Sequence, residues 1–275
     1  MKVAFFDADG TICHLKTGIS IQTRKVFEQL NHYGVFTVLC TARSMPFVTH
    51  DIKSLGFDAI ISSNGACTIR GTTVSNHKIP YEVVCEMLKI FQKPHLTPIL
   101  CGKEHIMFDS KLMNRSFDPW FDIIFSHIRN YTFPLHIFNP SFDVNKICVK
   151  LREPWLSTNE REFLFNKLQS ISACEIFPGL NHCGDLVEFE VTAPGRNKGT
   201  ATAELLQSLQ HSDSPVESWA FGDGAADVAM FEQVDHPIAM GNAEESVKKF
   251  AEHVTLDYQH DGVAVACQTY LIPPA

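Results

Sequence analysis

The sequence lacks several features that would narrow its function at once. Its nine cysteines include no C-x-x-C pair, and their odd number argues against a disulfide framework or a zinc cage. No apolar run approaches membrane-spanning length, and Asp7 comes too early for the apolar region of a signal peptide. No short-period repeat or low-complexity tract is visible. We therefore expect reduced, mostly buried thiols in a cytoplasmic protein with no membrane partner.

An excess of basic charge is also missing. The chain has 23 basic and 31 acidic residues, a formal net charge of −8, which argues against nucleic acid as the main partner. A small phosphorylated substrate is not excluded, because the local charge of a site can oppose the global sign. With 275 residues, of which 45% are hydrophobic, the chain can bury a sizeable core and form two domains.

Two carboxylates follow the first apolar run. Val3 to Phe6 predicts a buried strand, and Asp7 and Asp9 stand at its carboxyl end before a turn at Gly10. Open α/β sheets hold their ligands at this end. Two Asp residues one residue apart suit Mg²⁺, and one of them can serve as a nucleophile and the other as a proton donor. An ordinary polar turn explains the same residues equally well, since turns favour Asp and Gly.

Strands and helices alternate after this turn. The pattern predicts a helix from Ser20 to about Gly34, a helix over Pro46 to Leu55, and strands over Val35 to Leu39 and Ala59 to Ile61. Such alternation predicts a parallel sheet with right-handed crossovers. Thr41 and Arg43 follow the second strand, so they are expected beside the two Asp residues.

The alternation of strands and helices ends near Pro80. Paired strands with few helices follow, and they indicate an α+β insert with an antiparallel sheet. The alternation of helices and strands resumes at Lys198, where a helix precedes a strand over Ser218 to Phe221. We predict an α/β protein with a doubly wound, Rossmann-like parallel-sheet core and an inserted α+β cap domain. The core is discontinuous, over residues 1–80 and 192–275, and the cap covers residues 81–191.

Four polar clusters lie at predicted strand or helix ends. They are Asp7 with Asp9, Thr41 with Arg43, Lys198, and Asp223 with Asp227. The carboxyl ends of parallel strands meet at one edge of the sheet, so these distant residues can share one pocket. Their types fit phosphoryl transfer, in which catalysis is mostly positioning and neutralisation of developing charge.

In order and spacing, these motifs resemble those of the haloacid dehalogenase superfamily, in the Cof-like phosphatase branch with a large α/β cap. The resemblance covers essentially the full length. It rests on Asp7-Ala8-Asp9-Gly10-Thr11, Thr41-Ala42-Arg43, Ser63-Asn64-Gly65-Ala66, Asn197-Lys198-Gly199, Gly222-Asp223-Gly224 with Asp227, Met240-Gly241-Asn242-Ala243 and Asp261-Gly262-Val263-Ala264.

The resemblance implies a role for each catalytic residue. Asp7 resembles the nucleophile that becomes an aspartyl phosphate, and Asp9 resembles the acid that protonates the leaving alcohol and then activates water. Lys198 resembles the cation that bridges the nucleophile and the phosphoryl oxygens. Thr41 resembles a hydroxyl donor to the same oxygens.

The resemblance also implies a binding set. A Mg²⁺ cofactor is expected on Asp7, on the backbone carbonyl of Asp9 and on Asp223, with Asp227 supporting the metal. The expected phosphate-binding residues are Gly10, Thr11, Thr41, Arg43 and Lys198.

Three departures from the family pattern stand out. Ala226 replaces an Asn of the motif Gly-Asp-Gly-x-Asn-Asp, and Thr41-Ala42-Arg43 replaces a more usual Thr-Gly-Arg. The segment Tyr258-Gln259-His260-Asp261 replaces an Asn-rich form. Every ionisable group of the mechanism is kept, so we expect a tuned or slower enzyme, not an inactive one.

Three functions fit this pattern. The first is a Mg²⁺-dependent phosphatase acting on a small phosphorylated metabolite, such as a sugar phosphate, a flavin precursor, pyridoxal phosphate or a nucleotide. The second is a phosphotransferase or phosphomutase that protects the same aspartyl phosphate from water. The third, suggested by Ala226, is a phosphate-binding regulatory protein. We expect the insert to act as a lid that excludes water and selects the substrate.

Other eye-catching residues favour structural explanations. Cys13 and His14 are adjacent but lack a third orienting group, and His182 and Cys183 lack a second ligand pair. An aromatic stretch suits the core of the insert or a homodimer surface better than a ring-stacking platform for a sugar or base; it comprises Phe117, Trp120, Phe121, Phe125, Tyr131 and Phe133. Glu190 matches a family position without an assigned role.

Overall fold

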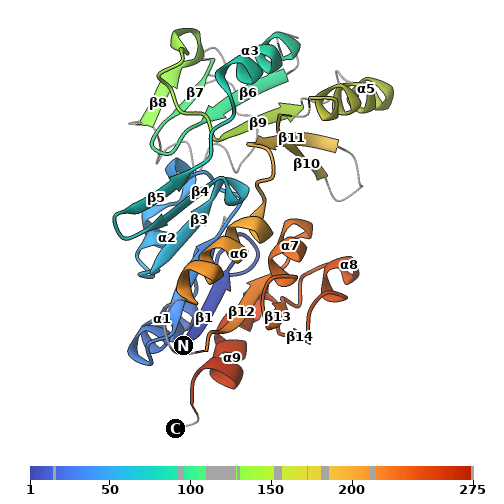
Figure 1. The fold of residues 1–275 in the computed structure, drawn as a ribbon. Coiled ribbons are helices and arrows are strands. Elements are labelled where there is room, and N and C mark those ends of the chain that lie inside the picture. The colour runs from blue at the N-terminus through green and yellow to red at the C-terminus, as the bar shows by residue number, and fades with distance from the viewer. Residues whose placement is uncertain are drawn as a thin grey trace. The chain divides into compact units, whose positions relative to one another are not determined.

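The computed structural model describes residues 1–14, 17–91, 96–109, 128, 131–151, 157–171, 173–180, 186–210 and 215–273. These residues form two compact units, and most of their helices and strands are labelled in Figure 1. The core unit contains Met1–Arg43, Val48–Ser75 and Asn197–Ala275. The inserted unit contains Ser44–Phe47 and Asn76–Arg196.

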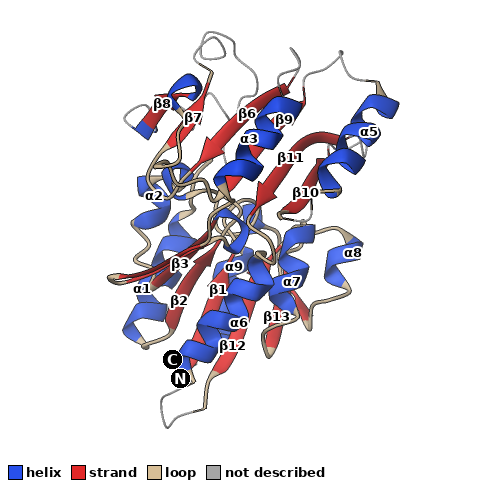
Figure 2. Cartoon of the chain, turned by 45° about the horizontal axis from the view of Figure 1, so that its top comes forward, coloured by secondary structure: helices blue, strands red, loops and turns tan. Residues whose placement is uncertain are grey.

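An eight-stranded sheet organises the core unit, in the order β14-β13-β12-β1-β2-β3-β4-β5. The six strands from β14 to β3 are parallel, and those from β13 to β3 run side by side in Figure 2. Strand β4 is antiparallel to β3. The predicted doubly wound α/β core is therefore confirmed. The strands are β1 (Lys2–Phe6), β2 (Phe36–Cys40), β3 (Ala59–Ser62), β4 (Cys67–Arg70), β5 (Thr73–Asn76), β12 (Glu217–Gly222), β13 (His236–Ala239) and β14 (His253–Val254).

Side chains of the central strand alternate between the two faces of this sheet. Val3 and Phe5 of β1 belong to a buried cluster that also contains residues of helices α6 (Lys198–Leu209) and α7 (Val228–Phe231). Phe6 faces the other way, and its ring lies 4.8 Å from that of Phe27 in α1 (Ile21–His32). Both faces of β1 are thus covered by helices.

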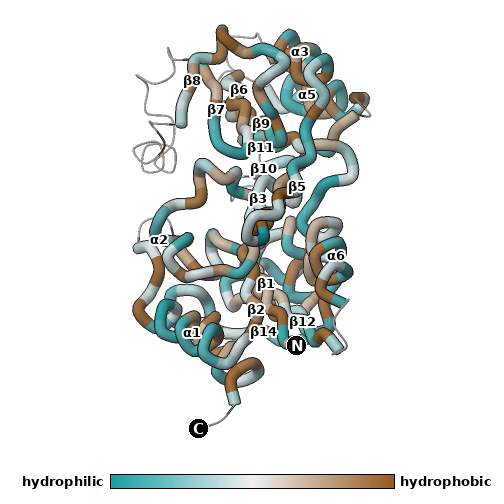
Figure 3. The backbone as a smooth tube through the Cα atoms, turned by 60° about the vertical axis from the view of Figure 1, so that its left-hand side comes forward, coloured by the Kyte–Doolittle hydropathy of each residue, from teal (hydrophilic) through white to brown (hydrophobic). Residues whose placement is uncertain are grey.

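Helix α1 shows how local sequence sets these elements. The side chain of Ser20 accepts a hydrogen bond from Thr23 N–H and caps the helix, and the chain leaves it at Gly34, which has φ +67°. Its buried residues recur at helical spacing, so polar and apolar positions alternate along the tube in Figure 3. The remaining helices of the core unit are α2 (His50–Lys53), α8 (Glu245–Lys248) and α9 (Gly262–Ala266).

The helix predicted over Pro46 to Leu55 is wrong in detail. The segment forms a 3-10 turn, Met45–Phe47, and the short helix α2. Thr49 separates them, because its backbone is extended, at φ −66° and ψ 160°, while its side chain caps α2.

A six-stranded sheet organises the inserted unit, in the order β10-β11-β9-β6-β7-β8. Its described strands pair antiparallel, as expected, except β7 with β8, which are parallel. Two described helices of the unit are α3 (Tyr81–Ile90) and α5 (Thr158–Gln169). The strands are β6 (Leu96–Cys101), β7 (Ile106–Phe108), β8 (Thr132–Pro134), β9 (Lys146–Leu151), β10 (Glu175–Leu180) and β11 (Leu186–Thr192).

Two sequence expectations fall largely outside the described residues. Of the aromatic stretch, the structure describes Tyr131 and Phe133, and both rings are partly exposed. His182 and Cys183 lie outside the described residues. The eight described cysteines are all free thiols, as expected. No helix in the described ranges is long and apolar enough to cross a membrane.

An ion pair joins two strands of the inserted sheet. Lys146 of β9 and Glu190 of β11 lie on neighbouring strands, and the Lys146 ammonium pairs with the Glu190 carboxylate. The side chain of Lys146 is only 3% exposed. A charge this deeply buried depends on its partner, which gives Glu190 a structural role.

We expect Glu190→Gln to destabilise the inserted unit by about 3 kcal/mol, because the Lys146 charge loses its counter-charge. Amide hydrogen exchange in β9 and β11 should then accelerate about a hundredfold. Glu104→Gln is the control, since Glu104 pairs with Lys103 at the surface. Exchange rates in β9 and β11 within threefold of the wild type would contradict this role.

Candidate active site

The core sheet brings the predicted site residues to one edge. Asp7 directly follows β1, Thr41 follows β2 and Asp223 follows β12, and these strands are neighbours in the order β12-β1-β2. Backbone hydrogen bonds continue the pairing past the strand ends, from Asp7 N–H to Phe221 O (2.9 Å) and from Thr41 N–H to Ile61 O (2.9 Å). The expected convergence at the carboxyl ends of the strands is therefore present in the core unit.

Lys198 joins two carboxylates from separate elements. Its Nζ lies 2.5 Å from Asp7 Oδ1 and 2.6 Å from Asp227 Oδ1. All three side chains are less than 10% exposed. Lys198 is the first residue of α6, which begins in a capping box between Asn197 and Thr200. The cap therefore fixes where the ammonium enters the site.

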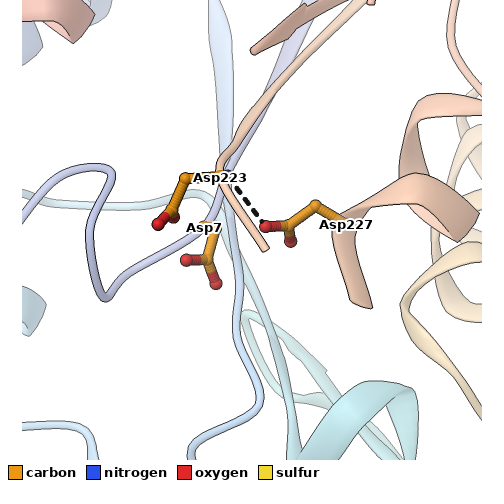
Figure 4. A group of neighbouring side chains, drawn as sticks. All are labelled: Asp7, Asp223 and Asp227. Carbon is orange, nitrogen blue, oxygen red and sulfur yellow. Dashed lines mark hydrogen bonds between the residues drawn. The ribbon is translucent and has the colours of Figure 1, made fainter. Parts of the chain in front are cut away.

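Three carboxylates form a group that can hold a metal ion. One ligand atom from each of Asp7, Asp223 and Asp227 lies within 4.8 Å of the others. Figure 4 shows these side chains and the hydrogen bond from the backbone N–H of Asp223 to Asp227. Asp227 Oδ2 accepts from the N–H groups of Asp223 (3.0 Å) and Gly224 (2.9 Å), while its Oδ1 faces Lys198. Both oxygens of Asp227 are thus engaged by the protein.

Asp223 is held from two sides. Thr11 Oγ1 donates to its Oδ1 at 3.0 Å, and Asn242 Nδ2 donates to its Oδ2 at 3.0 Å. The same Asn242 amide donates to Gly10 O (3.0 Å), and its Oδ1 accepts from Tyr258 N–H (3.1 Å). Asn242 thus joins the loop after β1 to the loop after β12. Sequence reasoning placed it in a motif but gave it no role.

Burial and crowding perturb the ionisation of this cluster. Burial raises the pKa of Asp7 well above its ordinary value, although the nearby Lys198 charge opposes the shift. Burial, and then the charge of Asp227, raise the pKa of Asp223 to about 7. Burial alone would lower the pKa of Lys198, but the charges of Asp227 and Asp7 outweigh it and raise that pKa. A bound cation would relieve the repulsion among these carboxylates.

Asp9 lies next to the cluster with a different partner. Its carboxylate receives two hydrogen bonds from Arg43, from Nε to Oδ2 at 2.7 Å and from Nη2 to Oδ1 at 2.6 Å. The Arg43 side chain is 5% exposed and that of Asp9 is 44% exposed. The expected phosphate-binding role of Arg43 stays a prediction, and the structure shows its guanidinium on Asp9.

A left-handed backbone segment supports this part of the site. Ser63, Asn64 and Gly65 follow β3 with φ values of 54°, 52° and 88°. Ser63 N–H donates to Arg43 O (2.8 Å), and Asn64 N–H donates to Thr41 O (3.3 Å). A Cβ on Gly65 would lie 2.1 Å from Asn197 O, so glycine allows this loop to approach the start of α6.

Gly10 and Ala226 are two small residues in the loops of the site. Gly10 has φ +81°, and a Cβ there would meet Asp223 Oδ2 at 2.3 Å, so the turn needs glycine. Ala226 is exposed in the 3-10 turn Ala225–Asp227. The side-chain amide that reaches Asp223 belongs to Asn242.

Cys13 and His14 do not form a thiol-imidazole pair. Cys13 Sγ donates to Ala8 O at 3.2 Å, and burial raises the pKa of this thiol far above its ordinary value. The His14 ring stacks on Tyr258, with a centroid distance of 5.1 Å. Both contacts agree with the expected structural roles.

Comparisons with known proteins agree with this geometry. The sequence model of the haloacid dehalogenase-like hydrolases matches residues 4–266. Phosphatase YwpJ of Bacillus subtilis is 25% identical over 293 residues, which cover 96% of this chain and 98% of the relative. A second B. subtilis protein, the 5-amino-6-(5-phospho-D-ribitylamino)uracil phosphatase YcsE, is 23% identical over 278 residues, or 99% and 96% of the two chains.

Solved structures show the same fold. A subclass IIB sugar phosphatase of the haloacid dehalogenase superfamily superposes with a TM-score of 0.75 at 24% identity, covering 98% of this chain and 99% of the other. A haloacid dehalogenase-like hydrolase from Bacteroides thetaiotaomicron gives a TM-score of 0.78 at 22% identity, covering 98% of both chains. Since the family model spans nearly the whole chain and the carboxylates and lysine converge at one sheet edge, the protein belongs to the haloacid dehalogenase-like hydrolases, as a phosphatase of the Cof-like branch.

Proposed function

We propose that the protein is a Mg²⁺-dependent phosphatase that hydrolyses a small phosphorylated metabolite through an aspartyl phosphate on Asp7. The observation that carries the proposal is the contact of Asp7 with Lys198 inside the carboxylate group of Asp7, Asp223 and Asp227. A carboxylate can approach an anionic phosphate only where cations screen the like charges. The buried Lys198 ammonium is one such cation.

The carboxylate group fits a hard divalent cation. Mg²⁺ prefers oxygen ligands, and Asp7 and Asp223 present carboxylate oxygens from neighbouring strand ends. As the family resemblance implies, we assign Asp7, the Asp9 carbonyl and Asp223 to the metal and Asp227 to support. Asp227 accepts hydrogen bonds from Lys198 and from two backbone N–H groups. When bound, Mg²⁺ would neutralise charge on the transferring phosphoryl group.

The reaction divides into two displacements. An Asp7 carboxylate oxygen attacks phosphorus, the bond from phosphorus to the leaving oxygen breaks, and Asp9 gives its proton to that oxygen. Water then attacks the phosphorus of the aspartyl phosphate, Asp9 takes a proton from it, and inorganic phosphate leaves as Asp7 is restored. Lys198, Thr41, Gly10 and Thr11 are proposed to bind the phosphoryl oxygens.

A sugar phosphate or a similar phosphorylated polyol is the proposed substrate. The names of similar proteins support this class, because they describe a sugar phosphatase and a phosphatase of a phosphoribityl compound. The expected cap domain, residues 81–191, is proposed to select the leaving group. The predicted cytoplasmic location, the homodimer alternative and the exclusion of nucleic acid stay predictions.

The nucleophile is tested with Asp7→Asn. With Mg²⁺ and p-nitrophenyl phosphate, release of inorganic phosphate should fall at least ~10³-fold, because an amide cannot attack phosphorus. Asp51→Asn, which changes a surface partner of Arg24, is the control and should keep full activity. The proposal would be wrong if the folded, Mg²⁺-loaded wild type had no activity on this ester or on a panel of sugar phosphates. Transfer of the phosphoryl group to an added sugar phosphate, without release of inorganic phosphate, would favour a mutase.

The pH dependence of metal binding follows from Asp223. Its pKa is about 7 in the folded protein against 3.8 ordinarily, so the folded state holds this proton more tightly than the unfolded chain. The stability from this group is present below about pH 4 and is lost as the pH rises through about 7.

Because Mg²⁺ binds the ionised carboxylate, it should raise the melting temperature more at pH 8 than at pH 6. Asp223→Asn should remove most of this shift at both pH values, whereas Asp51→Asn should keep it. The measurement is calorimetry with and without Mg²⁺. A shift of equal size at both pH values would count against a metal site on Asp223.

Asn242→Ala tests the hydrogen bonds that hold Asp223. Without the amide, Asp223 loses one of its two side-chain donors, so the Mg²⁺ concentration for half-maximal activity should rise about tenfold. The rate at saturating Mg²⁺ should change much less. Gln259→Ala is the matched control, because this amide also contacts Tyr258 but not Asp223. An unchanged Mg²⁺ requirement would show that Asn242 does not position the metal ligand.

A further inference from the structure

The Arg43 guanidinium and the Asp9 carboxylate form a two-point fork. Each oxygen of Asp9 accepts one hydrogen bond, at 2.7 Å from Nε and 2.6 Å from Nη2. Two parallel bonds between planar groups fix the plane of the carboxyl group as well as its position, which a single contact does not. Asp9 is the more exposed partner, at 44% against 5%, so the buried arginine holds the exposed acid.

The backbone of Arg43 is itself fixed. Its N–H donates to Thr41 Oγ1 at 3.1 Å, and its carbonyl accepts from Ser63 N–H at 2.8 Å. Ser63 has φ +54°, a conformation that costs a non-glycine residue energy and that the surrounding loop maintains. The fork is therefore anchored in the loops after β2 and β3, which are separate from the loop that carries Asp9.

A leaving alcohol needs a proton on a carboxyl oxygen that points at it. Each carboxyl oxygen has two lone-pair sites, and the fork uses one site on each oxygen of Asp9. An oxygen of Asp9 can therefore carry a proton on its second site while Arg43 keeps the carboxyl group oriented. Holding both oxygens in one plane needs two N–H groups in a fixed planar arrangement, which arginine offers and lysine does not.

We infer that Arg43 is a positioning residue for the proton donor Asp9, and not a phosphate ligand. The inference rests on the proposed phosphatase function and deepens it at the leaving-group side of the site. Two experimental results are expected from this role of Arg43. Loss of Arg43 should lower kcat/KM most for substrates whose leaving group needs a proton. This loss should occur only while Asp9 is present.

The first experiment compares two esters that carry the same ring. p-Nitrophenyl phosphate releases a stabilised phenolate that needs little protonation, whereas p-nitrobenzyl phosphate releases an alkoxide that needs the proton. For Arg43→Met we expect kcat/KM to fall about 100-fold on the benzyl ester and less than about 5-fold on the phenyl ester. Competitive inhibition by inorganic phosphate should stay within about threefold of the wild type, because no phosphate contact is lost.

The second experiment is a double-mutant cycle with Asp9→Asn. If Arg43 acts through Asp9, Arg43→Met should lower the benzyl ester rate less than about threefold in the Asp9→Asn background. Arg43→Lys should retain one hydrogen bond and show an intermediate loss, again larger on the benzyl ester. Arg24→Met, which breaks an exposed Arg–Asp pair with Asp51, is the control and should leave both esters unaffected. Calorimetry verifies folding, and Arg43→Lys carries the comparison if Arg43→Met unfolds.

Equal losses on the two esters, weaker inhibition by phosphate, or full multiplicative losses in the cycle would overturn the inference and make Arg43 a phosphate ligand. Wild-type protein that hydrolyses neither ester nor any sugar phosphate would instead overturn the proposed function. The two failures are therefore distinguishable.

Discussion

The contact on which the site depends is that of the buried Lys198 ammonium with Asp7 and Asp227. A lysine this deeply buried keeps its charge only because carboxylates surround it, and the carboxylates tolerate one another partly because the lysine is there. The balance is incomplete, since Asp7 and Asp223 still have raised pKa values. Ionising these carboxylates in the folded protein therefore costs free energy, and the binding of a cation there is proposed to offset that cost.

Several elements exist in their observed form because of this cluster. Gly65 lets the loop after β3 touch the start of α6, Gly10 leaves room for Asp223, and a Cβ on Gly222 would lie 2.5 Å from the Asp227 carboxyl carbon. The first two are close approaches between segments far apart in the sequence, and the third lies between the last residue of β12 and the turn that follows it. Side chains larger than hydrogen would push apart the loops that carry Asp7, Lys198 and Asp227. The parallel strand order supplies the edge, and the glycines allow the loops to meet there.

The sequence was enough to predict the parallel core, the insert and the meeting of Asp7, Lys198, Asp223 and Asp227, because strand order and family motifs carry that information. The helix over Pro46 to Leu55 was wrong, since an apolar pattern does not reveal the extended backbone at Thr49. Nor could the sequence show which way Arg43 points or which oxygens Asn242 reaches. Those partners depend on how the loops are spaced in three dimensions, and a sequence motif does not contain that information.

Ala226 takes on a different meaning once each carboxylate oxygen has a partner. Thr11 and Asn242 hold the two oxygens of Asp223, and Lys198 and two backbone N–H groups hold those of Asp227. No amide at position 226 is needed to orient either carboxylate, and Ala226 itself is exposed. What the substitution removes is a polar group that could face solvent or a bound molecule beside the cluster. Its consequence is therefore expected in how tightly substrate or metal is held, and not in the arrangement of the acids themselves.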